Sequence, residues 1–416
     1  MSLLRLENVP LYFGGTVALL VLKIIFTAIY NVYFHPLRKC KLPPTLQDAH
    51  CLRKYLDPGP KLASATGIVW AYYLYQGEEV AWTHKCHQKY GEVVRIGPDR
   101  LSYVTAQAWK DIIGFRTGGR LENSKDERAG LQEGPGSVPS ILNINDPHDH
   151  GRIRKIFTNA FSDKALKLQE PLISTHINKL IQNMYHTVSE NPDAHLEMVR
   201  LYNCTTFDIM GDLAFGEPLG MLDTGEYTPW VKAVFEGLKF GTYVRIAREY
   251  PWINSIMEAL APQTLRDAQA LHFDHSVERV NRRMERGDDP SKADIWKLVL
   301  SKGSEVLNPK EMHSNASVFM LAGTETTATL LSGATFHMLK NPSKMQRLIE
   351  EVRALSADQL TFEALARLPY LNACLEEAIR YYPPAPSLIP RIVAPGGNAI
   401  NGAWVPEGVS NDRIHE

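Results

Sequence analysis

A glycine and a glutamate stand at the centre of an otherwise apolar run. Residues 319–328 read Phe-Met-Leu-Ala-Gly-Thr-Glu-Thr-Thr-Ala. Inside a helix a glycine costs about 1 kcal/mol relative to alanine, and a buried carboxylate costs more unless it is paired or protonated. Ala322 and Gly323 would admit a flat group close to the backbone, and Glu325 beside Thr326 could relay protons through water. The alternative is that the threonines hydrogen-bond back to helix carbonyls and that Glu325 faces solvent.

A second constellation of charged residues follows further along the chain. Glu377 and Arg380 are three residues apart, which places them on one face of a helix, where an ion pair is natural. The Pro-Pro-Ala-Pro sequence at 383–386 then ends that helix. Exposed ion pairs contribute little to stability, so the pair alone does not identify a site.

The first constellation needs a long helix to position it, and the sequence marks both ends of one. Asn308 is a suitable N-cap, Pro309 suits the first helical position, and Glu311 suits the third, where it completes a capping box. The helical pattern stops at Asn341-Pro342. A helix of about thirty residues is ~45 Å long, so this one can run through a whole domain.

Helical periodicity dominates the chain after residue 149, and a small hairpin precedes it. Strands are expected at 93–96 and 101–104, on either side of a Gly-Pro-Asp turn, and a loop is expected at 118–140. The other expected helices lie at 78–90, 150–160, 164–189, 204–215, 229–239 and 262–286. The predicted fold class is therefore mainly α with small β-sheets.

Composition and charge exclude several classes of protein. The 416 residues include 44% hydrophobic and 22% charged residues, which is an ordinary globular composition. The formal net charge of −1 gives no field able to hold a polyanion, so we expect no nucleic-acid partner. The five cysteines are scattered without paired spacing, so we expect neither a disulfide framework nor a metal site built from them.

The amino terminus predicts a membrane anchor. Residues 10–33 carry one charge, Lys23, and are long enough to cross a bilayer as a helix of roughly 20 residues. Basic residues at 38, 39 and 41 outweigh Arg5 on the other side, which by the positive-inside rule leaves the body of the protein in the cytosol. A cleaved secretory signal is the alternative, although its apolar region is usually shorter. The predicted organisation is an anchor at 1–34, a proline-containing linker at 35–60 and a domain at 61–416.

In their order along the chain, these motifs resemble the cytochrome P450 family. Ala-Gly-Thr-Glu-Thr-Thr at 322–327 is followed by Glu-x-x-Arg at 377–380, by the prolines and by Pro390-Arg391. Lys-Tyr-Gly-Glu-Val-Val-Arg-Ile-Gly-Pro at 89–98 and Asp-His-Gly-Arg-Ile-Arg-Lys at 149–155 extend the resemblance over most of the chain. The form of these motifs is similar to that in fungal microsomal members of the family. The resemblance implies a P450-like fold with an amino-terminal transmembrane helix.

The resemblance also implies a haem b cofactor and the residues that bind it. His150 and Arg154 would reach one haem propionate and Arg391 would reach the other, which is sound chemistry for two carboxylates. Ala322 and Gly323 would lie against the haem. The competing interpretation of His150 and Arg154 is a solvated helix face.

The implied catalytic residues lie on the long helix. Thr326 would assist oxygen activation and Glu325 would help to deliver protons. Glu377 and Arg380 would be structural, because they would anchor the segment on the other side of the haem.

The implied activity is that of a monooxygenase. It would oxidise a lipophilic small molecule, in fungal secondary metabolism, with O2 and electrons from NADPH-cytochrome P450 reductase. The implied location is the endoplasmic reticulum membrane, with a single span and the catalytic body in the cytosol. Substrate contacts are expected from the loop at 118–140, from the surroundings of Phe319 and from residues 387–389.

Two stretches depart from the family's pattern. The family places the cysteine that ligates the haem iron in a loop with glycine and arginine after the Pro-Arg strand, and none of the five cysteines has those neighbours. Residues 410–416 do not match the family, which predicts a fold that is incomplete at its carboxyl end. Residues 40–57 are longer than the usual linker. Errors in the gene model, such as a retained intron and a premature stop, would explain both departures.

These departures leave a second function open. The alternative is a truncated, non-catalytic P450-like membrane protein without the thiolate ligand. A helical membrane receptor unrelated to haem remains only if the ordered motifs coincide by chance.

Overall fold

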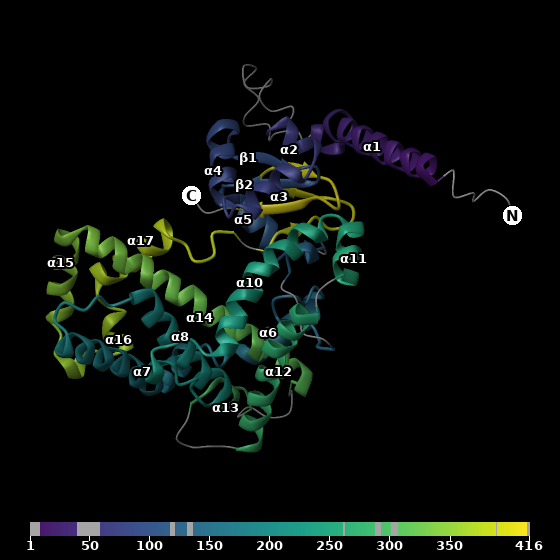
Figure 1. Ribbon diagram of the computed structural model, residues 1–416. Helices are drawn as coiled ribbons and strands as arrows, with labels where there is room; N and C mark the ends of the chain where they lie inside the picture. Colours follow the sequence, from purple (N-terminus) through teal and green to yellow (C-terminus); the bar gives the residue numbers. More distant parts are fainter. Residues whose placement is uncertain are drawn as a thin grey trace. The chain divides into compact units, whose positions relative to one another are not determined.

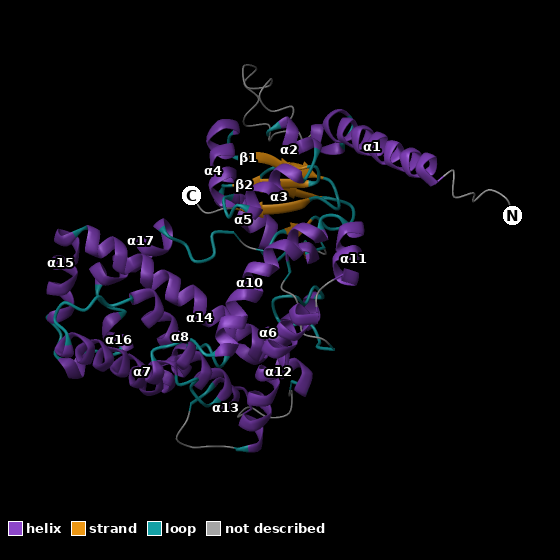
Figure 2. Ribbon diagram, viewed as in Figure 1, coloured by secondary structure: helices purple, strands orange, loops and turns teal. Residues whose placement is uncertain are grey.

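The chain folds into two compact units. The computed structural model covers residues 1–416 and describes 9–39, 59–116, 121–130, 136–260, 263–287, 293–300, 307–387 and 389–413. Unit 1 comprises Met1–Ala129, Thr242–Pro251 and Ser387–Glu416, and unit 2 comprises Gly130–Gly241 and Trp252–Pro386. Figures 1 and 2 show that the described residues are mostly helical, with a few short strands. The predicted fold class, mainly α with small sheets, is confirmed.

Unit 1 is built around a five-stranded sheet. Its order is β1-β2-β7-β4-β3, in which β2 and β7 are parallel and the other neighbours are antiparallel. The strands are β1 (Val93–Gly97), β2 (Arg100–Tyr103), β7 (Ser410–Arg413), β4 (Arg391–Ile392) and β3 (Ser124–Lys125). The hairpin predicted at 93–104 is confirmed. The tail that matched no family pattern supplies the central strand, because β7 pairs with β2 on one side and β4 on the other.

Short helices and a second hairpin complete unit 1. The hairpin joins β5 (Asn398–Ile400) to β6 (Ala403–Val405). The helices are α2 (Lys61–Ala65), α3 (Ile68–Tyr75), α4 (Glu79–Tyr90) and α5 (Ala106–Ile113), with the 3-10 turns η2 (Pro36–Lys39) and η4 (Glu127–Ala129). Two apolar clusters fill the unit. One lies around Trp70 and Trp82, and the other lies around Tyr103 and Ile400. The helix predicted at 78–90 is confirmed as α4.

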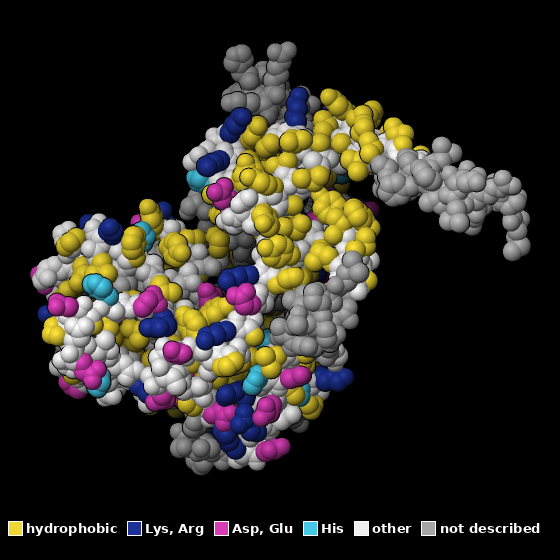
Figure 3. Space-filling model, in the orientation of Figure 1, with side chains coloured by type: hydrophobic (Ala, Val, Ile, Leu, Met, Phe, Trp, Pro, Cys, Tyr) yellow, Lys and Arg dark blue, Asp and Glu magenta, His cyan; other side chains and the backbone are white. Residues whose placement is uncertain are grey.

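The predicted anchor forms a helix, α1 (Val9–Tyr33). The side chains of Leu22 and Phe26 are 61% and 71% exposed, and Figure 3 shows hydrophobic side chains along the described part of this helix. Its end is tied to α2 because Asn31 Nδ2 donates to the carbonyl of Ala65 at 3.0 Å. Among the described helices none combines the length and the apolar character that a membrane span requires. Residues 40–58, most of the predicted linker, lie outside the described residues.

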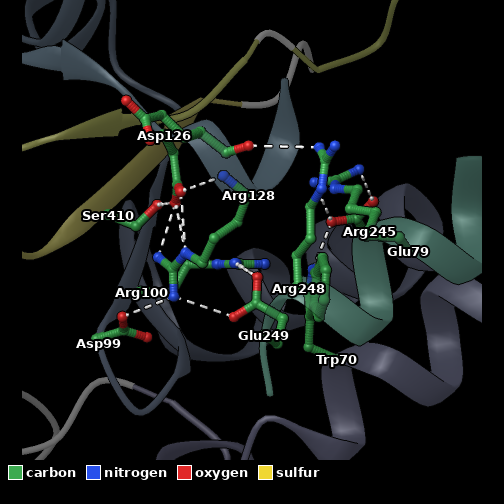
Figure 4. Close-up of polar contacts among 11 residues, drawn as sticks. Trp70, Glu79, Asp99, Arg100, Asp126, Arg128, Arg245, Arg248, Glu249 and Ser410 are labelled. Atoms are coloured by element: carbon green, nitrogen blue, oxygen red, sulfur yellow. Dashed lines mark hydrogen bonds and ion pairs between the residues drawn. The ribbon is translucent and has the colours of Figure 1, made fainter. Parts of the chain in front are cut away.

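A network of ionised side chains ties four segments of unit 1 together (Figure 4). Arg128 forms ion pairs with Asp126 at 2.7 Å, with Asp99 at 3.0 Å and with Glu249 at 3.1 Å. Glu249 also pairs with Arg100 of β2, and Ser410 Oγ of β7 donates to Asp126 at 2.8 Å. The network therefore holds the segment Thr242–Pro251 and the loop after β3 against the sheet.

Trp70 of α3 extends the same network. The guanidinium of Arg100 lies 4.0 Å from the centre of the Trp70 ring, close enough for a cation–π contact. The indole N–H of Trp70 donates to Glu79, which also pairs with Arg245 at 3.3 Å. Each buried cation here thus has an acid or an aromatic face beside it.

Unit 2 is organised around one long helix, α14 (Pro309–Lys340). Its predicted start is confirmed, because Asn308 and Glu311 form a reciprocal capping box and Pro309 takes the first helical position. Helix α8 (Met198–Phe215) lies alongside, and Tyr202 and Thr335 share a hydrogen bond of 2.7 Å across the pair. The core between them contains Phe207, Met320 and neighbouring apolar side chains.

The remaining helices surround α14 and α8. Predicted helices are found as α6 (Pro147–Thr158), α7 (Asp163–Glu190), α8, α10 (Pro229–Arg248) and α12 (Gln263–Glu285). The others are α9 (Met221–Thr224), α11 (Pro251–Leu260), α13 (Ile295–Leu300), α15 (Pro342–Arg353), α16 (Phe362–Leu365) and α17 (Pro369–Tyr381), with the 3-10 turn η5 (Ala357–Gln359). Helix α10 crosses the boundary between the units, since its last turns belong to unit 1.

Candidate functional site

Two threonines at the centre of α14, Thr324 and Thr326, donate hydrogen bonds to carbonyls of their own helix. Thr324 Oγ1 donates to the carbonyl of Met320 at 2.8 Å, and Thr326 Oγ1 donates to the carbonyl of Ala322 at 2.7 Å. The first half of the alternative interpretation therefore holds. Ala322 is exposed and Thr326 is half-buried, so this face of the helix presents a hydroxyl oxygen whose lone pairs remain able to accept.

Glu325 does not face solvent freely. It is half-buried, and its Oε2 atom is buried with no hydrogen-bond partner among the described residues. Burial raises the pKa of this carboxyl above its ordinary value of 4.5, because the charged form loses hydration and gains no partner among the described residues. The second half of the alternative interpretation therefore fails. A carboxyl in this state can hold and release a proton closer to neutral pH.

The backbone at Gly323 faces the neighbouring helix, α8. A Cβ atom added at this position would come within 2.6 Å of Met210 Sδ on α8, and real Cβ atoms do not approach that closely. The glycine thus permits close packing of α14 on α8. Its predicted contact with a haem stays a prediction.

Helix α6 carries the predicted propionate-binding residues His150 and Arg154. The helix begins at Asp146, whose side chain accepts from the backbone N–H of Asp149 at 2.8 Å. Arg152, between the two residues, pairs with Glu311 and so attaches α6 to α14. His150 is half-buried and Arg154 is exposed.

The start of α6 also gathers metal-binding atom types. Ligand atoms of Asp146, His148 and Asp149 lie within 4.8 Å of one another, and all three residues are exposed. The capping bond from Asp146 and the attraction of acids to a helix amino terminus explain the cluster.

Arg391, predicted to bind the other propionate, lies on β4 in unit 1. It is half-buried, and its Nε atom is buried with no hydrogen-bond partner among the described residues. Burial lowers the pKa of Arg391, and the negative charge of Glu122 opposes this shift. The group stays ionised nonetheless, because the ordinary arginine pKa is far above neutral. It is a half-buried cation whose Nε atom has spare donor capacity.

Glu377 and Arg380 form the ion pair that their spacing predicts. Arg380 donates through Nε and Nη2 to the two carboxylate oxygens of Glu377, each at 2.7 Å. Both side chains are more than half exposed. The hydrogen bond lowers the pKa of Glu377 and raises that of Arg380. Their predicted structural role stays a prediction.

The predicted substrate contacts are only partly described. Phe319 packs edge-on against Phe157 with ring centres 4.7 Å apart and against Phe161 at 5.5 Å, so it belongs to an aromatic cluster of unit 2. Residues 117–120, 131–135 and Leu388 lie outside the described residues. Within the loop predicted at 118–140, the structure instead places β3 and η4.

Comparisons with known proteins match the sequence to one family. The family model for cytochrome P450 matches residues 58–410. The chain belongs to the cytochrome P450 family. It is 43% identical to the cytochrome P450 monooxygenase efuB of Hormonema carpetanum over 402 residues, which cover 95% of this chain and 76% of that protein. It is 42% identical over 381 residues to the cytochrome P450 monooxygenase FUM2 of Gibberella moniliformis, covering 91% and 76% of the two chains. The cytochrome P450 monooxygenase aclL of Aspergillus oryzae is 36% identical over 392 residues, covering 94% and 75%.

Membership of this P450 family implies a haem, and part of this chain fits one. The orphaned Nε of Arg391 suits one of the two haem carboxylates, which otherwise would find no charge-assisted donor there. The exposed Ala322 leaves room for a flat group against α14. For the other haem carboxylate, His150 and Arg154 supply an imidazole and a guanidinium at helical i,i+4 spacing.

The described cysteines do not fit the haem iron. Cys86 and Cys204 are buried in apolar clusters of their units. Burial raises the pKa of each thiol to about 11, whereas an iron ligand must be a thiolate. Cys374 lies half-exposed on α17, and Cys40 and Cys51 are outside the described residues. The sulfur ligand of a P450 therefore has no identified donor among the described residues.

Sequence reasoning did not find the residue that faces Arg391 across the strand pair of unit 1, Lys125. It stands directly opposite Arg391 in the pairing of β3 and β4. The two residues are far apart in the chain and β3 has only two residues, so no local pattern reveals the pairing. The strand register alone brings them together.

Proposed function

We propose that this P450 is a monooxygenase that oxidises a lipophilic small molecule of fungal secondary metabolism. One oxygen atom of O2 enters the substrate and the other leaves as water, which requires two electrons and two protons. NADPH-cytochrome P450 reductase would supply the electrons. The proposal is supported by family membership and by relatives that are all named as monooxygenases from fungi.

The observation that carries the proposal is the unpaired carboxyl of Glu325. When bound, the haem would supply the site at which dioxygen is reduced. The chain itself must supply protons there, and burial raises the pKa of Glu325, whose buried Oε2 atom has no hydrogen-bond partner among the described residues. Thr326 lies next to it on the exposed side of α14, where its oxygen can accept a hydrogen bond from water. Together they would pass protons inward from solvent.

Three side chains would hold the haem by its carboxylates. His150 and Arg154 would bind one from α6, and Arg391 would bind the other from β4. Arg391 has the strongest support of the three, because its buried Nε has no hydrogen-bond partner within the described part of the chain. Glu377 and Arg380 would keep their structural role at the end of α17.

We further propose that α1 attaches the protein to the endoplasmic reticulum membrane with the body in the cytosol. The proposal rests on the exposed apolar side chains of α1 and on the basic residues that follow it. Flotation of the full chain with phospholipid vesicles tests the attachment, with deletion of residues 1–34 as the control. Equal flotation of the full chain and of the deletion variant would contradict attachment through α1.

The experiment for the main proposal is a turnover assay with the full chain, haem, the reductase and NADPH. Wild type should form oxidised product from a lipophilic substrate panel. Glu325→Gln should keep haem binding but divert most consumed NADPH to reduced oxygen species, since proton supply fails. Equal product yield per NADPH in wild type and Glu325→Gln would contradict the assigned role.

A second candidate, a non-catalytic P450-like membrane protein, is favoured by one observation. Cys86 and Cys204 are held as protonated thiols, so neither can donate charge to an iron atom. The spectrum of the reduced, carbon monoxide-bound protein separates the two functions. A thiolate-type spectrum supports the enzyme, and its absence in a haem-loaded protein supports the non-catalytic alternative.

A further inference from the structure

A histidine of unit 2 links three helices through one ring. His272 lies on α12, and its imidazole has a hydrogen-bond partner at each nitrogen. Its Nδ1 atom lies 3.2 Å from Nε1 of Trp230 on α10, and its Nε2 atom lies 2.8 Å from Oγ of Ser317 on α14. The imidazole and indole rings are also stacked, with their centres 5.7 Å apart and their planes 14° apart. The three side chains therefore connect α10, α12 and α14.

The indole determines which nitrogen of His272 carries the proton. A tryptophan Nε1–H group can only donate a hydrogen bond, so the Nδ1 atom must accept and carries no proton. The proton of the neutral imidazole then lies on Nε2, which donates to Ser317 Oγ. A general base that activates a serine needs a free Nε2 atom to take the proton. The pair therefore does not make Ser317 a nucleophile, and its role is to hold the helices.

A protonated imidazole does not fit the same arrangement. Both ring nitrogens of a charged histidine are donors, so an Nδ1–H group would face the N–H group of Trp230. Trp230 is only 4% exposed, and a buried donor without a partner is costly. The bond to Ser317 is retained, because Nε2 donates in both charge states. Only the contact between α12 and α10 depends on the charge of His272.

The charged groups near the ring also favour its neutral form. On α12, the ring of His275 lies 5.6 Å from that of Trp230, and the guanidinium of Arg279 lies 6.0 Å from the same ring. Arg279 is paired with Glu217 at 3.1 Å. The side chains that bond the imidazole from α10 and α14 are uncharged. Burial, followed by the charge of His275, lowers the pKa of His272 to about 4.

We propose that Trp230, His272 and Ser317 form a lock that joins α10 to α12 and α14 only while the imidazole is neutral. Protonation of His272 places a donor at Nδ1, releases Trp230 and leaves α12 bonded to α14. Ser317 lies about two turns before Glu325 on α14, so the lock holds the helix that carries the candidate proton-transfer residues. The lock needs no haem, and the haem-free chain therefore tests it apart from the proposed function.

The first test is a titration of the histidines in the haem-free full chain. Heteronuclear magnetic resonance of the ring nitrogens reports the tautomer and the charge of each imidazole. The His272 signal is identified as the one that Trp230→Phe and Ser317→Ala both shift. We expect its proton on Nε2 at neutral pH, and we expect it to become charged at a lower pH than the exposed His186 of α7. A proton on Nδ1 at neutral pH would overturn the lock.

The same two variants separate the lock from simple burial. Trp230→Phe keeps an aromatic ring but removes the donor, so the neutral state of His272 loses its bond. His272 should then bind a proton about tenfold more tightly, the value of one net hydrogen bond. Ser317→Ala removes a partner that accepts from Nε2 in both charge states, so proton affinity should not rise. A midpoint in Trp230→Phe equal to that of wild type, or an equal rise in both variants, would overturn the lock.

Hydrogen exchange tests the release of α10. As the pH falls towards the pKa of about 4, the backbone amides of Val231–Phe235 should exchange about tenfold faster in wild type than in His272→Gln, whose amide accepts and donates but does not titrate. At neutral pH the two proteins should match. His313→Gln is the control and should follow wild type, because His313, one turn before Ser317, bonds Asn281 of α12 at 2.8 Å and not α10. Equal exchange in wild type and His272→Gln at acidic pH would overturn the release.

Discussion

The two units treat a buried acid in opposite ways. In unit 1, burial alone would raise the pKa of Asp126, but hydrogen bonds and charge from Arg128 and a bond from Ser410 outweigh it and lower that pKa. In unit 2, burial raises the pKa of Glu325, and no group among the described residues compensates. The same kind of group is thus locked in its charged form in one place and poised to hold a proton in the other.

The difference separates structural charge from chemically available charge. Asp126 is one acid in a network of paired cations, so its ionised form stabilises the loop after β3. Glu325 receives no such bond at its Oε2 atom from any described residue, so its ionised form costs free energy in the fold. Groups left in that state are candidates for proton transfer, while paired groups are candidates for holding segments together.

The largest effect on stability should come from removing the paired acid, Asp126. Asp126→Ala leaves Arg128 partly buried without its closest partner, and we expect a loss of about 3 kcal/mol in the free energy of unfolding. Urea denaturation measures it. Asp193→Ala, which removes an exposed acid of unit 2, should change that free energy by less than about 0.5 kcal/mol. Equal losses in the two variants would show that the network is not structural.

The same pairing predicts a pH dependence with a defined sign. The folded pKa of Asp126 lies below the ordinary value of 3.8, so its stabilising contribution is complete above that value and is lost as the pH falls through the folded pKa. The difference in unfolding free energy between wild type and Asp126→Ala should therefore shrink on acidification below pH 3.8. A difference that grows on acidification would contradict the pairing.

A smaller effect is expected where packing, rather than charge, constrains the centre of α14. Gly323→Ala gains helix propensity but pushes a Cβ atom against Met210, and we expect a net loss of about 1 kcal/mol. Gly237→Ala on α10 is a matched control, because nothing lies within 4 Å of the added atom, and it should be neutral or stabilising. Thermal unfolding of both variants checks this. If Gly323→Ala stabilised the protein, close packing against Met210 could not be the reason for a glycine at this position.

Removing the charge of the unpaired acid, Glu325, should change stability in the opposite direction. Glu325→Gln removes a charge that nothing compensates, so stability at neutral pH should stay equal or rise by less than about 1 kcal/mol. Because the folded pKa of Glu325 is raised, wild type loses stability relative to this variant as the pH rises from 4.5 through that pKa. Denaturation at several pH values, with the exposed Glu226→Gln as control, measures the difference. A clear loss of stability would mean that Glu325 is paired.

The smallest effect is expected for the exposed pair Glu377 and Arg380. Both groups lie in solvent, where screening and side-chain entropy offset the attraction. Glu377→Gln should therefore leave the denaturation midpoint unchanged within error. A measurable loss would show that the pair has a partner outside the described residues.

Local signals predicted the long helices well. The capping box at 308–311 and the proline at 342 are signals only a few residues long, and α14 has the bounds that they indicate. The α7 helix and the β1–β2 hairpin also follow from periodicity and turn residues. Such features depend on neighbours in the chain, so one sequence suffices to find them.

Long-range features were not predictable in this way. The β7 strand pairs with β2, more than three hundred residues earlier, and no local pattern announces that partner. The same holds for Lys125 opposite Arg391, which depends on the register of two strands of two residues each. Sequence reasoning left the orientation of Glu325 open between a proton relay and a solvent-facing side chain, because a helical repeat does not say which neighbour buries a given face.

The titration of the Glu325 carboxyl tests the central claim most directly. Infrared difference spectra of wild type against Glu325→Gln, recorded over a range of pH, isolate the protonated carboxyl band of this residue. The account predicts a midpoint above the ordinary value of 4.5, since the buried oxygen has no partner in the part of the chain that the structure describes. A midpoint at or below that value would show that Glu325 is paired like Asp126, and would contradict its assignment as the proton-holding group of α14.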